Sequence, residues 1–411
     1  MLAQEGARVV IGDLLEEEGK RTELRPTSWA GSLLSSIAGF TGGRTSSYAA
    51  CKRAVRLLTK STATRYEADG IRCNSVHPEH IACCALFLAS VEASFMTERG
   101  GHRGRPHREI KALTPDSNAI IQRRTMAEIF VLGGGTPTPT AERFGSSHVL
   151  KIGDELLMFD CGPAATHKLV KAGLFPTQVD NLFFTHHHFD HNIDYPCFLL
   201  CRWDQAAGKG PELNVYGPAL TEEITRGLIG ENGVFSPDWR ARVGHPLSQQ
   251  VYVNRGGTLP RVPPNPRAKN IGAGEVASGK DWQVSAAPAE HVQPWLDSLA
   301  YRVDTPDGSV VFTGDTQPCQ SVIDLARDAD MMLCMCWDDQ EVMNETGEAT
   351  GQCGTTGAAE MAQEAGVKKL VLVHMGPGLS AQAPFHDAKS AMQRIYQGQI
   401  IFSEELLTID L

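Results

Sequence analysis

The sequence of 411 residues predicts an α/β fold in which two mixed β-sheets lie between layers of helices. Three observations carry this prediction. The C-terminal two thirds are rich in short apolar runs of strand length, and several of these runs end at a histidine or an aspartate. At 42% hydrophobic residues, the chain can bury one large core or two domains of typical size. Helices are expected between the strands, near residues 164–173, 219–229, 319–328, 356–366 and 384–397.

Residues 1–98 form the first predicted segment, in which four short stretches stand out. Residues 7–13 read as a strand that ends in an acid, and residues 35–39 form a Ser-containing stretch. Residues 48–52 carry a Tyr-x-x-x-Lys pattern on a helical stretch, and residues 70–78 read as a strand with its turn. Together they resemble the short-chain dehydrogenase/reductase family. The resemblance implies Tyr48 as general acid/base, Lys52 as the residue that lowers its pKa, and Asp13 as a contact to the adenosine ribose.

This segment lacks parts that the resemblance requires. A dinucleotide-binding fold needs a Gly-rich turn after its first strand, where backbone N–H groups and a helix N-terminus receive the pyrophosphate. The sequence starts after that point, and the family's middle strands, expected between Leu24 and Ser32, are missing. We therefore expect an incomplete Rossmann-like N-terminal segment without a competent nicotinamide site. An Arg-, Gly- and Pro-containing linker at residues 99–125 is expected to follow it.

The third predicted segment, residues 126–411, contains the strongest motif. Residues 185–191 read Thr-His-His-His-Phe-Asp-His and follow an apolar run, residues 179–184, that predicts a buried strand. Neutral imidazole and carboxylate are ligands that suit zinc and similar divalent ions, and one turn after a strand lets two metals share a loop. A solvated, His-rich turn is the alternative. The candidate ligands pair as His186 with His188 for one ion, and Asp190 with His191 for a second.

Three single residues later in the chain follow the same pattern, because each closes an apolar, strand-like run. They are His291, Asp315 and His374. A lone histidine at a strand end is more often structural than a ligand. In this order, and together with the turn at residues 185–191, the three residues favour a centre for two divalent metal ions over a solvated turn.

The stretch from residue 130 to 411 resembles the metallo-β-lactamase superfamily, specifically its ribonuclease Z-like and arylsulfatase-like branch. Besides the metal motif, the resemblance rests on stretches typical of that branch's first hairpin and turn: residues 131–139, Arg143, 145–148 and 157–162. It implies a metallo-β-lactamase αββα sandwich with hydrolase activity. It also implies two divalent metal ions, with Zn2+ expected, held at one edge of the sandwich.

The resemblance further implies a role for each ligand. His186, His188 and His291 would hold the first metal, Asp190, His191 and His374 the second, and Asp315 would bridge both. Two cations that share a hydroxide make a nucleophile available at neutral pH, because they lower the pKa of bound water from ~16 toward ~7. Asp190 would also be catalytic by orienting that nucleophile.

Two departures from the branch bear on the substrate. Ribonuclease Z enzymes place an RNA-gripping arm between the third metal histidine and the bridging aspartate, but His291 and Asp315 are close in sequence. These nucleases also carry a proton-donating histidine, supported by a glutamate, where this chain has Gln352 and the acid-free strand 333–337. General acid catalysis is worth ~10²–10⁴-fold when the leaving group is poor. We therefore expect a metal-dependent hydrolase of a small-molecule substrate with a good leaving group.

Two other functions stay open. Within the same fold, the alternative is a phosphodiesterase or ribonuclease Z-like endonuclease. From another class, the alternative is an NAD(P)-dependent short-chain oxidoreductase that uses Tyr48 and Lys52. The Pro-rich stretch 254–266 is either a surface excursion or a substrate lid or dimer contact, so a homodimer is among the expectations.

Charge and composition set the expected partners and location. Residues 126–411 carry 20 Lys and Arg against 35 Asp and Glu, a net charge of −15. Because binding of a phosphate backbone draws on Lys and Arg, this balance predicts that nucleic acid is an unlikely partner. No apolar run reaches the ~18 residues of a membrane span, so no membrane partner is expected. Scattered cysteines without a disulfide or zinc-knuckle spacing, and no secretory leader, predict a cytoplasmic protein.

Overall fold

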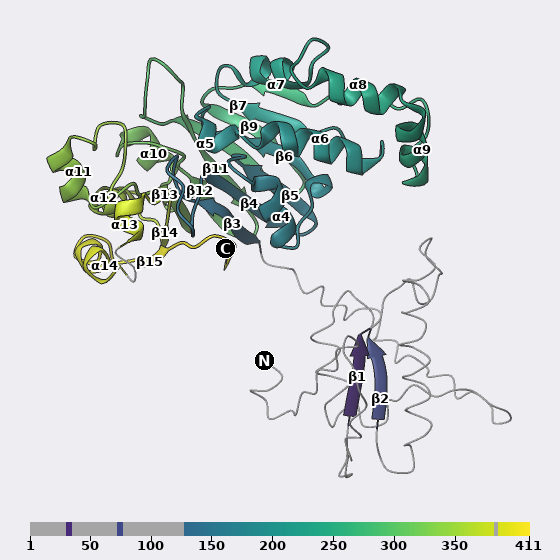
Figure 1. Ribbon diagram of the computed structural model, residues 1–411. Helices are drawn as coiled ribbons and strands as arrows, with labels where there is room; N and C mark the ends of the chain where they lie inside the picture. Colours follow the sequence, from purple (N-terminus) through teal and green to yellow (C-terminus); the bar gives the residue numbers. More distant parts are fainter. Residues whose placement is uncertain (1–29, 35–71, 77–126, 382–384) are drawn as a thin grey trace. The chain divides into compact units, whose positions relative to one another are not determined.

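The computed structural model describes residues 30–34, 72–76, 127–381 and 385–411 (Figure 1). The chain divides into two units, Met1–Ala119 and Ile120–Leu411. In the first unit, β1 (Ala30–Leu34) and β2 (Arg72–Val76) pair in parallel. Asp13, Tyr48 and Lys52 lie outside the described residues, as do the predicted linker and most of residues 1–98. The predicted domain boundaries therefore stay a prediction.

The second unit contains two seven-stranded mixed sheets. Sheet one holds, in spatial order, β16 (Leu407–Asp410), β3 (Glu128–Gly134), β4 (Ser146–Ile152), β5 (Glu155–Phe159), β6 (Val179–Phe183), β7 (Asn214–Gly217) and β8 (Arg267–Asn270). Sheet two holds β15 (Gln399–Phe402), β14 (Lys369–Val373), β13 (Met331–Met335), β12 (Gly308–Phe312), β11 (Leu299–Thr305), β10 (Gln283–Pro288) and β9 (Gly274–Ser278). The chain builds most of sheet one first, then sheet two, and returns to sheet one with its last strand.

Helices cover the outer face of each sheet. Sheet one packs against α4 (Ala165–Lys171), α6 (Tyr195–Ala206) and α7 (Thr221–Ile229), and sheet two against α10 (Gln320–Leu325), α12 (Thr355–Ala365) and α14 (His386–Gln393). Shorter or peripheral elements are η2 (Pro176–Gln178), α5 (Phe189–Asn192), α8 (Ser236–Gly244), α9 (Pro246–Asn254), α11 (Gln340–Thr346) and α13 (Pro377–Ser380). The predicted αββα sandwich is confirmed, and all five predicted helices are present.

The main core lies between the two sheets. The rings of Phe159 and Phe312, one from each sheet, stack with centroids 3.9 Å apart. Tyr301 packs beside Phe159 and donates a 2.7 Å hydrogen bond to the Phe184 carbonyl oxygen, just after β6. Central strands such as β14 are buried along nearly their whole length, because parallel strands in this fold have both faces covered. The packing therefore fixes the position of one sheet relative to the other at the edge where the metal motif lies.

Six helices that the structure describes were not predicted from the sequence: α5, α6, α8, α9, α11 and α13. Among the described side chains of α8 and α9, only Ser236, Trp239 and Tyr252 are buried, so these helices have no apolar period that sequence reading could detect. Figure 1 shows α8 and α9 at the end of the unit opposite to α11 and α14. The irregular stretch after α9, residues 255–266, follows the Pro-rich pattern that predicted it.

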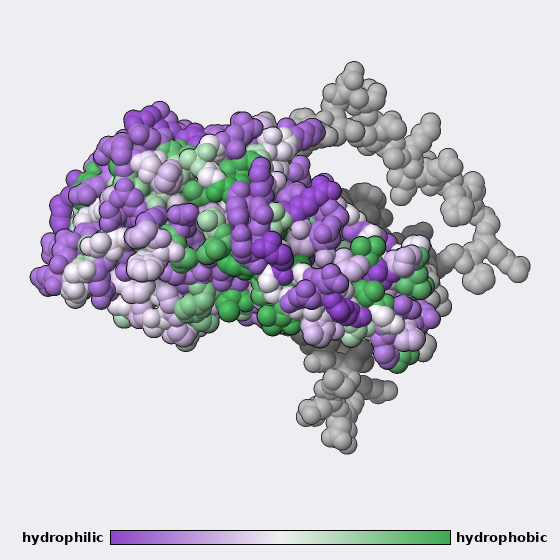
Figure 2. Space-filling model, turned by 90° about the horizontal axis from the view of Figure 1, so that it is seen from above, coloured by the Kyte–Doolittle hydropathy of each residue, from purple (hydrophilic) through white to green (hydrophobic). Residues whose placement is uncertain are grey.

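The surface of the second unit is mixed in polarity. The face seen in Figure 2 is mostly hydrophilic, with separate apolar patches between the polar side chains. Trp295, at 86% exposure, is the most exposed of the large hydrophobic side chains in the described part of the chain. Within that part, no helix is both long and apolar enough to cross a membrane.

Candidate metal centre

The seven predicted ligands come together at one edge of the sandwich. They stand after the C-terminal ends of four strands, β6 in sheet one and β10, β12 and β14 in sheet two. Their ligand atoms form two groups, each with all atoms within 4.8 Å of one another: His186, His188, His291 and Asp315, and Asp190, His191 and His374. The sequence predicted two sets of three ligands bridged by Asp315, and in the structure the Asp315 carboxylate falls in the same group as His186, His188 and His291.

Three imidazoles converge in the first group. His188 Nδ1 lies 3.0 Å from His186 Nε2 and 3.2 Å from His291 Nε2. Two ring nitrogens at this distance repel through their lone pairs unless one donates a proton to the other, and the one Nδ1 of His188 carries at most one proton for its two neighbours. A cation placed between the three nitrogens removes that repulsion, and imidazole nitrogen is a usual ligand of zinc.

The second group faces the same carboxylate from the other side. His374 Nε2 lies 3.1 Å from Asp190 Oδ2, and His191 Nε2 lies 3.6 Å from that oxygen. Asp315 Oδ1 is 3.4 Å from His191 Nε2, and Asp315 Oδ2 is 3.3 Å from His374 Nε2. Asp315 Oδ2 also lies 3.8 Å from His291 Nε2, in the first group. The Asp315 carboxylate therefore sits between the groups, as a bridging ligand must.

Hydrogen bonds outside the cluster fix the rings. Asp160 Oδ2 accepts a 2.7 Å hydrogen bond from His191 Nδ1, and Asp160 also accepts from the backbone N–H and the hydroxyl of Thr185. Gly351 O accepts a 2.6 Å bond from His291 Nδ1. Each bond holds a proton on Nδ1, so that Nε2 faces the cluster with a free lone pair. Asp160 and Gly351 belong to the site although the sequence did not mark them as site residues.

The backbone is strained where it delivers these groups. His374 has a φ of 52°, a left-handed conformation that costs a non-glycine residue of order 1–3 kcal/mol. Gly314, next to Asp315, has a φ of 59°, and a Cβ there would collide with the Thr185 side chain. Gly314 therefore allows the turn of sheet two to approach the turn of sheet one, which brings Asp315 to the histidines.

Burial and charge set the protonation of the cluster. Burial, helped by nearby His191, holds the pKa of His186 well below its usual value, so the ring stays neutral. Burial opposes protonation of His191 too, but Asp315 and Asp160 outweigh it and raise its pKa. Burial also opposes ionisation of Asp315, but His374 and His191 outweigh it and lower its pKa well below the usual range. The carboxylates thus create a negative field that stabilises positive charge at this point.

The donor set fits a divalent cation. His191 Nε2 and Asp315 Oδ1 are buried and lack a hydrogen-bond partner among the described residues, yet they face each other across the cluster. Buried polar atoms without partners are costly, and a bound ion would satisfy both. Nitrogen and carboxylate oxygen together are the ligand types of zinc and related metals.

Three residues near the cluster are not among its seven ligands. His187, inside the motif, turns away, and its Nε2 lies 2.8 Å from Thr221 Oγ1 at the start of α7. Gln352 lies beside Gly351, which binds His291, and is partly exposed. Met335 is buried, and its sulfur accepts a hydrogen bond from Thr316 N. The strand that ends near the cluster therefore presents a thioether there and no acid.

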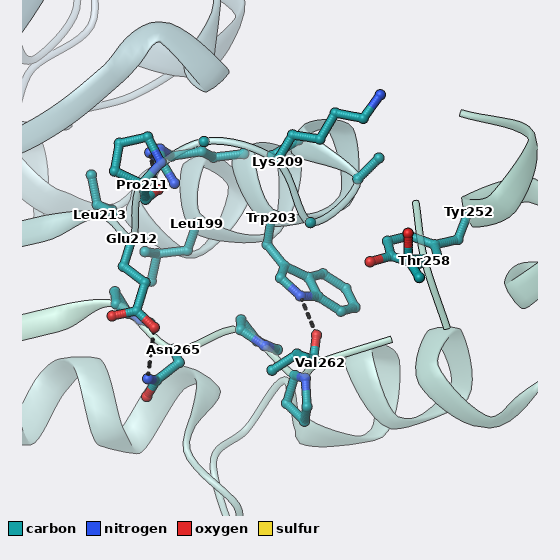
Figure 3. Close-up of a pocket in the computed structure, with 18 of the residues that line it drawn as sticks. Leu199, Trp203, Lys209, Pro211, Glu212, Leu213, Tyr252, Thr258, Val262 and Asn265 are labelled. Atoms are coloured by element: carbon teal, nitrogen blue, oxygen red, sulfur yellow. Dashed lines mark hydrogen bonds between the residues drawn. The ribbon is translucent and has the colours of Figure 1, made fainter. Parts of the chain in front are cut away.

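A separate cavity of about 570 Å³ lies between the end of α6 and the loop at residues 255–266, and none of the seven clustered residues lines it. Figure 3 shows Trp203 directed toward Val262, whose carbonyl oxygen accepts a 2.9 Å hydrogen bond from the indole Nε1. The loop behind it is held by Arg261, whose guanidinium stacks on Trp203 at 4.0 Å. Whether this loop acts as a substrate lid or a dimer contact stays a prediction.

Comparisons with known proteins agree with the fold. A model of the beta-lactamase superfamily domain matches residues 156–375. Ribonuclease Z of Mycobacterium sp. (strain KMS) is 28% identical over 267 residues, 62% of this chain and 86% of the relative. Ribonuclease Z of Methanothermobacter thermautotrophicus is 27% identical over 301 residues, 61% of this chain and 87% of the relative. The crystal structure of the metallo-beta-lactamase fold protein YhfI from Bacillus subtilis matches with a TM-score of 0.53 at 17% identity, covering 70% of this chain and 100% of that one.

These relatives correct one prediction. Nucleic acid was predicted to be an unlikely partner, and this is wrong, because the curated relatives are ribonucleases. The physical error was to average charge over a whole domain. From the start of α8 to the end of β8, residues 236–270 carry six Lys and Arg but one Asp, so the net charge of the unit does not describe each of its segments. Acids of the same unit pair with all five arginines of this segment.

Two finer resemblances remain without support. The family match begins at residue 156, and the described part of residues 1–126 consists of two short strands, so nothing supports a short-chain dehydrogenase or a Rossmann-like segment. The arylsulfatase-like part of the resemblance likewise has no counterpart among these relatives.

Proposed function

Because this chain belongs to the metallo-β-lactamase superfamily and is a hydrolase of that fold, we propose that it is a metal-dependent phosphodiesterase of the ribonuclease Z type. The observation that carries the proposal is the convergence of seven histidine and aspartate side chains on two adjacent points, with Asp315 between them. Its relatives at 27–28% identity point to RNA as the substrate class.

We assign the ligands as the sequence predicted. His186, His188 and His291 would hold one divalent ion, Asp190, His191 and His374 a second, and Asp315 would bridge them; zinc is the proposed metal. When bound, such ions lower the pKa of a coordinated water toward ~7 and polarise the ester oxygens. Asp160 and Gly351 keep His191 and His291 in the ligand tautomer by holding a proton on each Nδ1.

Asp190 is the proposed catalytic residue. Its Oδ2 lies 3.1 Å from His374 Nε2 and is buried with it, so the carboxylate faces the same point as the ligand rings. Burial opposes its ionisation, but the hydrogen bond with His374 and the charge of His191 outweigh burial and lower the pKa of Asp190. It therefore stays ionised at neutral pH and accepts a hydrogen bond from the attacking water, which orients that water toward the phosphorus.

A second candidate function is hydrolysis of a small-molecule ester with a good leaving group. It is favoured by one observation, the identity of the residues beside the cluster. Gln352 can donate a hydrogen bond to a departing oxygen but cannot give it a proton, and Met335 offers no acid to support a donor. The two candidates differ in how the rate depends on the leaving group.

A leaving-group series on the zinc-reconstituted full chain tests both candidates. We expect hydrolysis of a short RNA and of aryl phosphodiesters, with the aryl rate rising steeply as the leaving group's pKa falls, because no residue at position 352 donates a proton. Gln352→His is expected to raise the rate on poor leaving groups by part of the ~10²–10⁴-fold that a general acid is worth. Gln250→His, on exposed α9, is the matched control.

Three outcomes separate the candidates. Cleavage of aryl carboxylic esters or lactones without any phosphodiester cleavage would replace the main proposal by the second one. A rate that does not depend on leaving-group pKa, under conditions where chemistry limits turnover, would mean that another residue supplies the proton. No hydrolysis of any substrate by protein with full metal content would overturn both.

We also propose a cytosolic location. The seven cysteines in the described part of the chain are all free thiols, and five of them are buried. Burial raises the pKa of the Cys161 thiol well above its usual value, which keeps it protonated and unreactive. Thiols that persist in this form fit reducing surroundings.

A further inference from the structure

The loop between β10 and β11 closes beside the metal centre. It begins at Ala289 and ends at Ser298, and these residues are joined by a 2.9 Å bond from Ala289 N to Ser298 O. The next residue, Leu299, donates a 2.9 Å bond to Thr185 O, immediately before His186. The loop also contains His291, whose Nε2 is in the cluster. Both the base of the loop and one of its side chains are therefore tied to the proposed metal site.

Trp295 stands on this loop with its side chain in water. At 86% exposure, its large apolar ring is left unburied, which costs free energy in proportion to its area. The loop that displays it is ordered by its own bonds. His291 N donates to Gln293 Oε1 at 2.8 Å, Gln293 Nε2 donates to Ala289 O at 2.7 Å, and Trp295 N donates to Val292 O at 3.0 Å.

Further apolar side chains are exposed on the facing turn. Phe189 follows the candidate ligand His188 and is 50% exposed, and Ile193 in the same turn is 54% exposed. The two turns meet where His188 Nδ1 approaches His291 Nε2 at 3.2 Å. The two turns that meet at this pair of histidines therefore expose three large apolar side chains. We call them the apolar rim: Phe189, Ile193 and Trp295.

The charge of the loop limits what the rim can bind. Residues 289–298 include Glu290 and Asp297 and no Lys or Arg. A phosphate group approaching this loop meets like charge and finds no basic partner, so the loop does not suit the backbone of a nucleic acid. A planar, uncharged ring does suit it, because stacking on indole buries apolar area on both partners and needs no charge.

We propose that Trp295 determines substrate specificity by stacking on a planar aromatic ring of the substrate, next to the ester that the metal centre cleaves. The proposal rests on the proposed function of that centre and adds a substrate feature to it. The ring is either a nucleobase or the aromatic part of the leaving group. The ordered loop lowers the entropy lost on binding, because the indole is already held in place.

Two esters that share a leaving group separate these sources. The p-nitrophenyl ester of thymidine 5′-phosphate carries a base, and p-nitrophenyl ethyl phosphate does not. If the base stacks, Trp295→Ala raises KM for the thymidine ester about 10-fold more than for the ethyl ester, within the roughly 5- to 100-fold that stacking is worth. If the leaving ring stacks, the variant raises both KM values together, and an alkyl ester with a similar rate is unaffected.

Two variants control the experiment. Trp295→Phe keeps an aromatic face and should recover most of the affinity, whereas loss of a purely structural residue would not be rescued in this selective way. Leu247→Ala removes a side chain that is 72% exposed on α9 and should leave both KM values unchanged. A change of less than 2-fold in KM for every aromatic ester in Trp295→Ala would overturn the proposal.

A binding measurement keeps this proposal separate from the proposed function. Calorimetric titration of the zinc-loaded chain with thymidine 5′-monophosphate and with p-nitrophenyl phosphate needs no turnover. Weaker binding of either compound by Trp295→Ala supports stacking even if the enzyme cleaves neither ester, in which case only the proposed function fails. Equal affinity of wild type and variant for both compounds, or no binding of either by the wild type, overturns the stacking proposal.

Discussion

A single carboxylate at Asp315 contacts histidines from both groups of the cluster. Its oxygens lie within 4.0 Å of His186, His191, His291 and His374. Because the four rings come from three different turns, one on sheet one and two on sheet two, Asp315 also connects the two sheets at this edge. Its removal should be felt by both proposed metals at once.

Asp315→Ala should therefore lose both metal ions. We expect wild-type protein, reconstituted with zinc and dialysed, to hold close to two ions per chain and the variant to hold far fewer than one. Elemental analysis measures the content. His187→Ala is the control, because this neighbouring histidine binds Thr221 and not the cluster. Retention of one tightly bound ion by Asp315→Ala would contradict a bridging role.

His148 makes stability depend on pH. It is buried beneath the cluster, and burial, followed by the charges of His191 and His374, lowers its pKa to about 3. Its pKa in the unfolded chain is near ~6.5, so between these values the unfolded state binds more protons than the folded state. The free energy of unfolding should therefore fall as pH drops from ~6.5 toward 3.

The contribution of His148 is isolated by substitution. Urea unfolding of the zinc-loaded protein at several pH values should give a shallower pH dependence for His148→Asn than for wild type, whatever the variant's stability at pH 7. The difference in slope is the measured quantity, since other histidines contribute equally to both proteins. Parallel slopes would mean that His148 is not buried in its neutral form.

Among the elements, the loop at residues 255–266 depends on one carboxylate of α6. Asp204 binds Arg242 at 3.3 Å, Arg255 at 2.6 Å and Arg261 at 2.7 Å. Only the Arg261 side chain is buried, and it lies over the Tyr252 ring as well as over Trp203. An irregular, Pro-rich loop keeps a defined position because α6 supplies its counter-charge.

Asp204→Asn should destabilise the second unit by about 3 kcal/mol, the lower end of the cost of removing one partner from a buried ion pair. The buried Arg261 would lose its counter-ion, which can cost ~3–5 kcal/mol, but the two other arginines are partly in water and contribute little. The control is Asp324→Asn, which breaks an exposed pair with Arg327 that should be worth under ~1 kcal/mol. Chemical denaturation of both variants checks the difference. Equal losses would show that burial of Arg261 does not matter.

Site residues could be predicted from the sequence where a local pattern marked them, and not where their role depends on contacts between residues far apart in the chain. The turn from His186 to His191 was visible because four ligands stand in six positions, and His291, Asp315 and His374 because each ends an apolar strand. Asp160 and Gly351 were missed because they act across 31 and 60 residues, through contacts that exist only after the sheets have packed. Polar helices α8 and α9 carry almost no buried residues, so no apolar pattern marks them.

At the scale of the whole molecule, the second unit is self-sufficient in its strand pairing. Its first strand, β3, pairs with β4 on one side and with β16 on the other, and all three belong to the unit. All seven candidate ligands also lie within it. Nothing in its described pairings or in the proposed site requires residues 1–125.

Deletion of residues 1–125 should therefore leave the melting temperature and the hydrolytic rate of the second unit nearly unchanged. Calorimetry and turnover on an aryl phosphodiester, with the full chain measured in parallel, check this. Tight binding of NADH or NADPH by the full chain that disappears on deletion would instead reveal a working dinucleotide domain. A large loss of thermal stability would mean that the first residues support the hydrolase fold directly.

The last strand, β16, returns to sheet one and pairs with the first strand, β3, so the chain of the second unit finishes beside its first strand. Leu411 N donates a 2.9 Å bond to Ala127 O, and Asp410 stands opposite Glu128, so the first and last residues that the structure describes in this unit are neighbours. The fold therefore does not depend on where along this chain the N- and C-termini are placed. A circular permutant that joins these ends and begins at the exposed turn before Gly274 keeps every pairing within each sheet. In such a chain the strands of sheet two would be synthesised before most strands of sheet one. The order in which the two sheets are made would be reversed, while the edge that holds the seven candidate ligands would stay the same.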